Sequence, residues 1–272
     1  MFKIWTKIFI IPIILLFITY TWTEMGYPGP FSKNFEGGFF RLRNFSKTQC
    51  QNAACIKVIE KSKEFQNKKI LLVGDSEAES ISDLFISIYG QRGLNLSRSG
   101  CSFILESLRS YHSYECSNFD HQRQLLIKKS EFSQIYIFNR YTPPNSLARS
   151  KYIEFIRTFT QVSTNVTIIS APPEINGNFQ AFSSLVFHNP IGTPSEFNKE
   201  NFNQETIEWN EFLSRYINQN KDWNLKYVDS FRIICRSFPC RLKDQKGKWL
   251  YLDSTHLSAY GGMLILKEIA KM

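Results

Sequence analysis

Short apolar runs alternate with helix-like segments along most of this 272-residue chain, and this alternation constrains the fold more than any other feature. A parallel connection between strands needs a crossover segment, so the pattern predicts a parallel sheet with helices on both faces. We therefore expect an α/β fold, a three-layer α/β/α sandwich of flavodoxin-like type. The expected strands are 69–73, 95–97, 134–138, 166–169 and 225–228, and the expected helices are 77–89, 119–129, 150–162, 203–218 and 258–271.

The N-terminus predicts the compartment. Lys3 and Lys7 precede an apolar run over residues 8–22, and counted from Ile4 the stretch approaches the ~17–25 residues that span a bilayer. The run ends in Thr-Trp-Thr-Glu-Met-Gly, a poor match to the small-residue site at which a signal peptide is cleaved. We favour an uncleaved signal anchor over residues 1–24, with a cleaved signal peptide and a secreted domain as the alternative. In both cases the lysines stay in the cytoplasm and the domain is exported to the periplasm or cell surface.

The rest of the chain is interpreted as one domain with a lead-in. Residues 25–67 contain Gly, Pro, Phe and Arg without a clear period, which favours a stalk that leads to a domain over 68–272. The Pro- and Asn-rich stretch 171–200 has weak periodicity. We interpret it as a long surface loop that acts as a lid or a substrate-binding insert.

The six cysteines fall into three sequence-near pairs. An exported chain permits disulfides, and local pairs cost the least loop-closure entropy. Six cysteines allow about 15 connectivities, so the pairing is a hypothesis. No C-x-x-C pair is present and the chain has only four histidines, so we expect neither a metal site nor a cofactor. The predicted disulfides are Cys50–Cys55, Cys101–Cys116 and Cys235–Cys240.

The net charge of +9 allows two interpretations. It can attract an acidic partner such as an anionic polysaccharide or lipid headgroups, or it can reflect a basic, Lys- and Asn-rich proteome. The second is favoured because the basic residues are scattered and form no compact run. Nucleic acid is not an expected partner, since neither zinc-ligand spacing nor an aromatic-basic RNA-binding motif occurs.

Two polar motifs lie next to predicted elements. Gly74-Asp75-Ser76 directly follows the first strand, where a serine on a tight turn would point into a cleft at the carboxyl edge of the sheet. Asp253 lies three residues before His256, just ahead of the last helix, so it could orient the imidazole. Alone, the first motif is more often a helix cap and the second more often a surface loop. Together they fit a serine activated by a histidine.

The order of these motifs resembles the SGNH (GDSL-like) hydrolase superfamily, and most closely the SGNH domain that accompanies acyltransferase-3 membrane proteins. The resemblance spans about residues 68–270, and four short stretches carry it. They are Ile70-Leu-Leu-Val-Gly-Asp-Ser76, Ser99-Gly-Cys-Ser102, Cys235-x4-Cys240 and Trp249-Leu-Tyr-Leu-Asp-Ser-Thr-His-Leu-Ser258. The last stretch, a short cysteine loop that runs into Tyr-x-Asp-x-x-His-Leu-Ser, is the most specific.

The resemblance implies a role for each matching residue. Ser76 corresponds to the nucleophile, and Asp253 and His256 to the rest of the triad. The backbone N–H groups of Ser76 and Gly100 would form the oxyanion hole, and Asn139 is a weaker candidate for it. A plain turn glycine is the alternative for Gly100.

Three features depart from the family pattern. The superfamily has a Gly-x-Asn-Asp block, whereas this chain has Phe138-Asn139-Arg140-Tyr141, which is closer to the acyltransferase-associated version. Glu77 stands where that subfamily often has histidine. The multi-span acyltransferase domain of the subfamily has no counterpart in residues 1–272, so we expect any membrane donor to be a separate protein.

The expected function is transfer of an acyl group, acetyl above all, onto cell-surface carbohydrate through an acyl-serine. The alternatives are a carbohydrate O-acetyl esterase of the same fold and a non-catalytic glycan-binding module. A eukaryotic secretory protein is a further alternative, because Asn44, Asn95 and Asn165 begin glycosylation-type sequons. An Asn-rich chain produces such sequons by chance, and a bacterial envelope is favoured.

Overall fold

The structure is a computed structural model that describes residues 52–104, 114–140, 145–161, 163, 165–176, 196–245, 250–251 and 254–272. The predicted signal anchor over residues 1–24, the first part of the stalk, Asp253 and most of the 171–200 loop lie outside the described residues. No helix within the described ranges has the length and hydropathy needed to cross a membrane.

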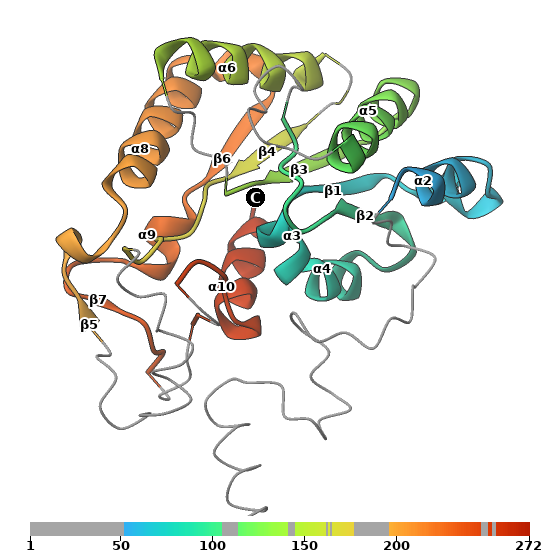
Figure 1. The fold of residues 1–272 in the computed structure, drawn as a ribbon. Helices are drawn as coiled ribbons and strands as arrows, with labels where there is room; N and C mark the ends of the chain where they lie inside the picture. The colour runs from blue at the N-terminus through green and yellow to red at the C-terminus, as the bar shows by residue number, and fades with distance from the viewer. Residues whose placement is uncertain are drawn as a thin grey trace, which may run out of the picture.

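A parallel sheet forms the centre of the molecule (Figure 1). Among the described residues it has five strands, and every neighbouring pair is parallel. Nearly all strand residues are buried, as expected for a sheet covered on both faces. This confirms the predicted strands to within two residues. In spatial order they are β2 (Gly93–Ser97), β1 (Ile70–Gly74), β3 (Gln134–Phe138), β4 (Val166–Ile169) and β6 (Leu225–Val228).

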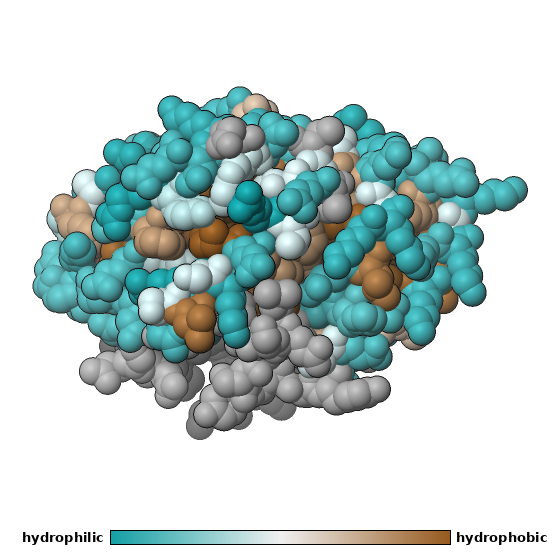
Figure 2. All heavy atoms as spheres, turned by 90° about the horizontal axis from the view of Figure 1, so that it is seen from above, coloured by the Kyte–Doolittle hydropathy of each residue, from teal (hydrophilic) through white to brown (hydrophobic). Residues whose placement is uncertain are grey.

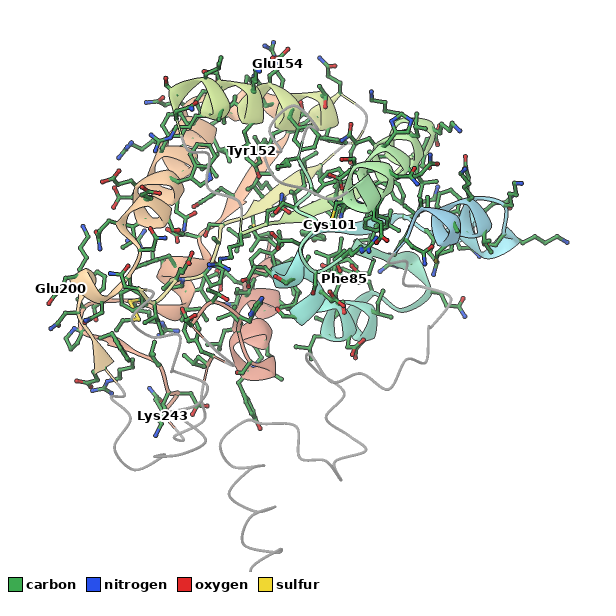
Figure 3. All side chains as sticks on the ribbon, in the orientation of Figure 1. Phe85, Cys101, Tyr152, Glu154, Glu200 and Lys243 are labelled. Carbon is green, nitrogen blue, oxygen red and sulfur yellow. A yellow bond between two sulfur atoms is a disulfide. The ribbon has the colours of Figure 1, made fainter. Side chains whose placement is uncertain are left out.

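Helices cover both faces of the sheet, which confirms the three-layer prediction (Figure 1). Each layer packs on its own apolar core, and Tyr152 and Phe85, labelled in Figure 3, belong to different cores. One layer holds α2 (Ala53–Glu60), α5 (Tyr114–Lys129), α6 (Ser146–Thr160) and α8 (Gln204–Gln219). The other holds α3 (Ser76–Ser80), α4 (Ser82–Tyr89), α9 (Ser230–Ile234) and α10 (Ala259–Ile269).

Smaller elements complete the described fold. Strands β5 (Glu196–Phe197) and β7 (Cys240–Arg241) pair antiparallel in a sheet of their own. Short 3-10 turns are η1 (Lys63–Asn67), η2 (Gly90–Arg92), η5 (Lys199–Asn201) and η6 (Lys221–Trp223).

Two helical segments differ from the sequence prediction. The helix predicted over 77–89 is two helices, with a break at Ile81, which is fully buried and lies against Gly262 of α10. Helix α2 was not predicted. Its Ile56 and Ile59 are buried in the core next to α5, so the folded unit also includes residues 52–67.

Disulfides join Cys101 to Cys116 and Cys235 to Cys240, as predicted. Cys55 is also disulfide-bonded, and its expected partner Cys50 lies outside the described residues. The sequon at Asn95 is not available for glycosylation, because the Asn95 side chain is buried in β2 and accepts a hydrogen bond from the Ser97 N–H.

Candidate active site

Ser76 is the first residue of α3 and lies on the tight turn that leads out of β1. Gly74 makes this turn possible: a Cβ there would overlap the Phe138 carbonyl oxygen and lie 2.7 Å from the Ala78 Cβ. Asp75 then caps α3, with its Oδ1 accepting a hydrogen bond from the Glu77 N–H at 3.0 Å. The turn therefore places the serine at the carboxyl edge of the sheet, where α/β proteins bind ligands.

His256 meets Ser76 across 180 positions of sequence, with the His256 Nε2 2.9 Å from the Ser76 Oγ. A local turn holds the histidine. The Ser258 N–H donates to the Leu250 carbonyl at 2.9 Å, and Ser258 then caps α10. The His256 Nδ1 lies 3.1 Å from the Thr255 hydroxyl. The predicted partner Asp253 lies outside the described residues, so its role in orienting His256 stays a prediction.

Asp75 joins three loops at the site. Its carboxylate accepts hydrogen bonds from the Glu77 N–H, the Ser102 hydroxyl and the Arg140 N–H, each at 3.0 Å. These donors follow β1, β2 and β3. Burial raises the pKa of Asp75 above its usual value, and the three hydrogen bonds oppose that shift. Asp75 lies within the Gly74-Asp75-Ser76 motif, but its role was not predictable from the sequence, since its partners come from separate segments.

The oxyanion candidate Gly100 lies in a turn that α3 anchors. Its φ is +72°, in the left-handed region that favours glycine, and a Cβ there would contact nothing within 4 Å. The Glu79 Oε2 accepts hydrogen bonds from the neighbouring Ser99 N–H and hydroxyl, at 2.8 and 2.6 Å. The Cys101–Cys116 disulfide ties the other side of this turn to α5. The turn is thus well supported, and the oxyanion role of Gly100 stays a prediction.

The side-chain amide of Asn139 is buried and clamps the loop that follows β2. Its Oδ1 accepts from the Phe103 N–H at 2.9 Å, and its Nδ2 donates to the Phe103 carbonyl at 2.8 Å. Asn139 therefore supports the loop that carries Gly100. A contribution of its remaining amide proton to the oxyanion hole stays a prediction.

Beneath this site, α5 supplies a buried cation that sequence analysis did not find. The Arg123 guanidinium donates to the carbonyls of Gly74 and Leu96 at 2.8 and 2.9 Å, and to that of Cys101 at 3.0 Å. Arg123 is fully buried and forms an ion pair with Asp120. One side chain therefore holds the ends of β1 and β2 and the loop after them.

Arg140 and Tyr251 attach the loop after β4 to the site. Arg140 forms an ion pair with Glu174; burial lowers the pKa of Arg140, but Glu174 raises it, and the net pKa lies above the usual value. The Tyr251 hydroxyl donates to the Pro173 carbonyl at 2.8 Å, and burial raises the pKa of Tyr251, so it stays a neutral donor. The histidine turn and the 173–176 segment are therefore held together.

Two features define the class of protein. The fold is a parallel α/β sheet, and a serine at a strand-to-helix turn is hydrogen-bonded to a histidine just before the last helix. The protein is an SGNH-type serine enzyme that acts on acyl groups, as a transferase or a hydrolase. Residues 43–271 match the family model described as the SGNH domain fused to AT3 domains, and the chain belongs to this family.

Several solved structures match the chain at different levels of similarity. The periplasmic domain of a lipopolysaccharide acetyltransferase from Salmonella ser. Paratyphi A is 16% identical, with a TM-score of 0.60 over 83% of this chain and 90% of that chain. A carbohydrate acetylesterase family member from Sinorhizobium meliloti is 12% identical, with a TM-score of 0.44 over 75% and 98%. An acetylxylan esterase mutant from Geobacillus stearothermophilus is 13% identical, with a TM-score of 0.41 over 75% and 93%. No curated protein sequence matches the chain.

Proposed function

We propose that the protein is an extracytoplasmic O-acyltransferase that places acetyl groups on cell-surface carbohydrate through an acyl-serine. The observation that carries the proposal is the 2.9 Å contact between the Ser76 Oγ and the His256 Nε2, because a base within hydrogen-bond reach is what a serine needs to become a nucleophile.

The proposed reaction has two balanced halves. In the first, the Ser76 Oγ bonds to the acyl carbon while His256 takes the serine proton. The bond from the acyl carbon to the donor then breaks, and His256 returns the proton to the leaving group. In the second half, a sugar hydroxyl attacks the acyl-serine and gives its proton to His256. The ester bond to Ser76 breaks, and the serine oxygen regains a proton.

Other groups would support the reaction without forming a bond to the acyl group. Asp253 would orient His256 and stabilise the imidazolium. The N–H groups of Ser76 and Gly100 would bind the oxyanion, and Asn139 and Arg123 would hold the backbone that carries them. The carboxylate of Asp75 would hold the loops in register.

The choice of transfer over hydrolysis rests on the family. Its model is named for fusion to AT3 domains, and the Salmonella structure is a periplasmic acetyltransferase domain. We propose that the chain uses a separate multi-span membrane acyltransferase as its acyl donor. Residues 1–24 would anchor the chain by one span, residues 25–67 would lead to the domain with α2 packed against it, and residues 68–272 would carry the catalysis. This arrangement places the domain in the periplasm or at the cell surface.

The test compares the full chain with Ser76→Ala, and with Ser80→Ala as a control on the same helix. We expect Ser76→Ala to lower turnover of 4-nitrophenyl acetate by at least ~10³-fold and to abolish labelling by a fluorophosphonate probe. Ser80→Ala should retain both activities. Undiminished turnover or labelling in Ser76→Ala would reject the catalytic assignment and favour a glycan-binding module.

A second measurement separates transfer from hydrolysis. The acyl-enzyme is offered an envelope polysaccharide, and mass spectrometry follows both acetylated sugar and free acetate. Acetylated sugar that depends on Ser76 supports the transferase. Free acetate alone, unchanged by added polysaccharide, would make the protein an esterase.

A further inference from the structure

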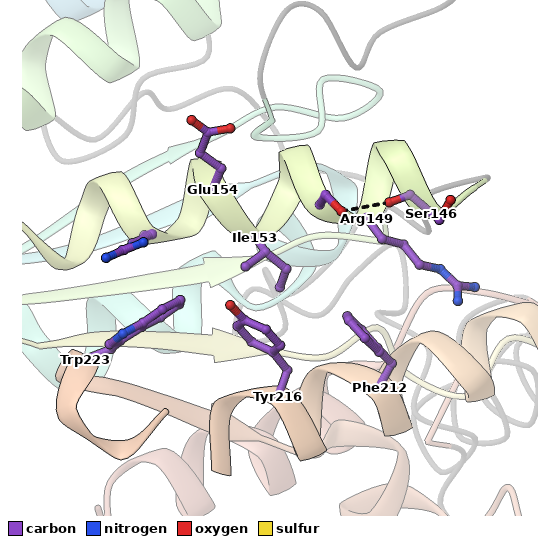
Figure 4. Close-up of a pocket in the computed structure, with 9 residues that line it drawn as sticks. Ser146, Arg149, Ile153, Glu154, Phe212, Tyr216 and Trp223 are labelled. Atoms are coloured by element: carbon purple, nitrogen blue, oxygen red, sulfur yellow. Dashed lines mark hydrogen bonds between the residues drawn. The ribbon is translucent and has the colours of Figure 1, made fainter. Parts of the chain in front are cut away.

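A groove of about 550 Å³ runs between α6 and α8, outside the catalytic residues described above (Figure 4). Phe212 and Tyr216 of α8 and Trp223 of the following turn point from one wall towards α6 (Figure 4). The Phe212 and Tyr216 rings stack 5.9 Å apart, and Tyr216 and Trp223 lie 5.5 Å apart. All three are partly exposed, so part of each ring is open to a ligand.

Arginines of α6 form the other wall. Arg157 lies over the Trp223 ring at 5.1 Å, and Arg149 lies 5.8 Å from the Trp209 ring. Within the described part of the chain neither guanidinium has a carboxylate partner, and the Arg149 Nε is buried without a hydrogen bond. Glu154 is the single acidic residue among the described lining residues. The groove therefore combines ring faces with surplus positive charge.

The position of the groove relates it to the active site. Helix α6 begins shortly after Arg140, whose N–H bonds to the Asp75 carboxylate beside Ser76. The lining residues then follow α6 from Ser146 at its start to Arg157 near its end. Figure 2 looks onto the side that carries α6, where hydrophobic side chains surface in small patches among hydrophilic ones. A chain-like ligand along this groove could reach the edge of the sheet that holds the serine.

Sugar chemistry fits these groups. The C–H face of a pyranose ring packs on an aromatic ring, whose face is electron-rich. Arginine donates paired hydrogen bonds to a carboxylate or phosphate. An uncharged apolar ligand would desolvate Arg149 and Arg157 without a counter-charge, which is unfavourable.

We propose that the α6–α8 groove binds an acidic glycan, holding a stretch of the polymer away from the unit that is acylated at Ser76. The choice of a glycan over other anions rests on the proposed function. The groove itself and its charge do not depend on catalysis.

The test measures binding on the full chain carrying Ser76→Ala, so that it is independent of turnover. A hexamer of galacturonic acid is titrated against the protein and compared with a hexamer of glucose. Binding is followed by calorimetry and tryptophan fluorescence. We expect Arg157→Ala and Trp223→Ala each to weaken binding of the acidic hexamer about tenfold. Arg157 is exposed, so its variant should fold, which circular dichroism checks.

Lys151→Ala is the matched control, because it removes one positive charge from α6 at a residue that does not line the groove. It should leave binding within about twofold. The proposal is overturned if the groove variants bind as the parent does, or if Lys151→Ala weakens binding equally. It is also overturned if the glucose hexamer, or single-stranded DNA of equal charge, binds more tightly than the acidic hexamer. Absence of acyl turnover would reject the proposed function and leave this binding result standing.

Discussion

Replacement of Arg123 by Met tests whether a buried cation holds the catalytic loops together. The methionine keeps an apolar stem of similar length but removes three hydrogen bonds to backbone carbonyls, at 2.8, 2.9 and 3.0 Å. It also leaves the buried Asp120 carboxylate without its Arg123 partner.

The expected cost follows from this burial. Removal of one partner from a buried ion pair costs about 3–5 kcal/mol, because the remaining charge has lost both water and its counter-charge. For a domain of this size each kcal/mol lowers the melting temperature by about 2–4 °C. We therefore expect Arg123→Met to lower it by roughly 6–20 °C.

Thermal unfolding followed by circular dichroism measures this loss. The double variant Asp120→Asn with Arg123→Met should recover part of it, since the charge left behind is then gone, while the three carbonyls still lack their donor. A fall of less than about 2 °C in the single variant would refute the reasoning, because so small a change corresponds to about 1 kcal/mol or less. A double variant no more stable than the single one would show that the cost does not come from the loss of the Asp120–Arg123 ion pair.

Three further changes test the turn and its supports. Gly74→Ala should destabilise the protein in urea unfolding by more than Gly90→Ala. A Cβ at Gly74 overlaps a carbonyl of β3, whereas one at Gly90 contacts nothing and costs only backbone strain of about 1–3 kcal/mol. Equal losses of stability in the two variants would contradict this. Burial raises the pKa of Asp75 above 3.8, so its contribution to the free energy of unfolding should fall as pH rises from that value through the folded pKa. In Asp75→Asn the free energy of unfolding should not show this fall when it is measured across acidic pH. The same dependence on pH in the variant as in the parent would argue against the raised pKa of Asp75. Asn139→Leu should cost about 1–3 kcal/mol through loss of both hydrogen bonds to the loop after β2, and a neutral result in denaturant unfolding would count against that clamp.

The layered fold and the two reacting side chains could be predicted from the chain itself. Short runs such as 134–138 and 166–169 are mainly apolar and are separated by segments with helical spacing, which is typical of strands buried in a parallel sheet. Ser76 and His256 were found because each lies in a short motif beside such an element. Nearest-neighbour patterns of this kind depend only on residues a few positions apart.

The break between α3 and α4 was not predictable in the same way, because neither Pro nor Gly occurs in residues 76–89 to mark it. The core contacts of α2 were also hidden, since a stretch of eight residues carries little periodic signal.

By itself the sequence determined the class of fold, the order of its strands along the chain, and the residues that could react. The tertiary structure decided that the Ser76 hydroxyl and the His256 ring meet, and that Asp75 and Arg123 hold the ends of separate strands. The physical reason is that hydrophobic periodicity is local, whereas a hydrogen bond between groups 180 positions apart exists only once the crossovers have brought both to one edge of the sheet.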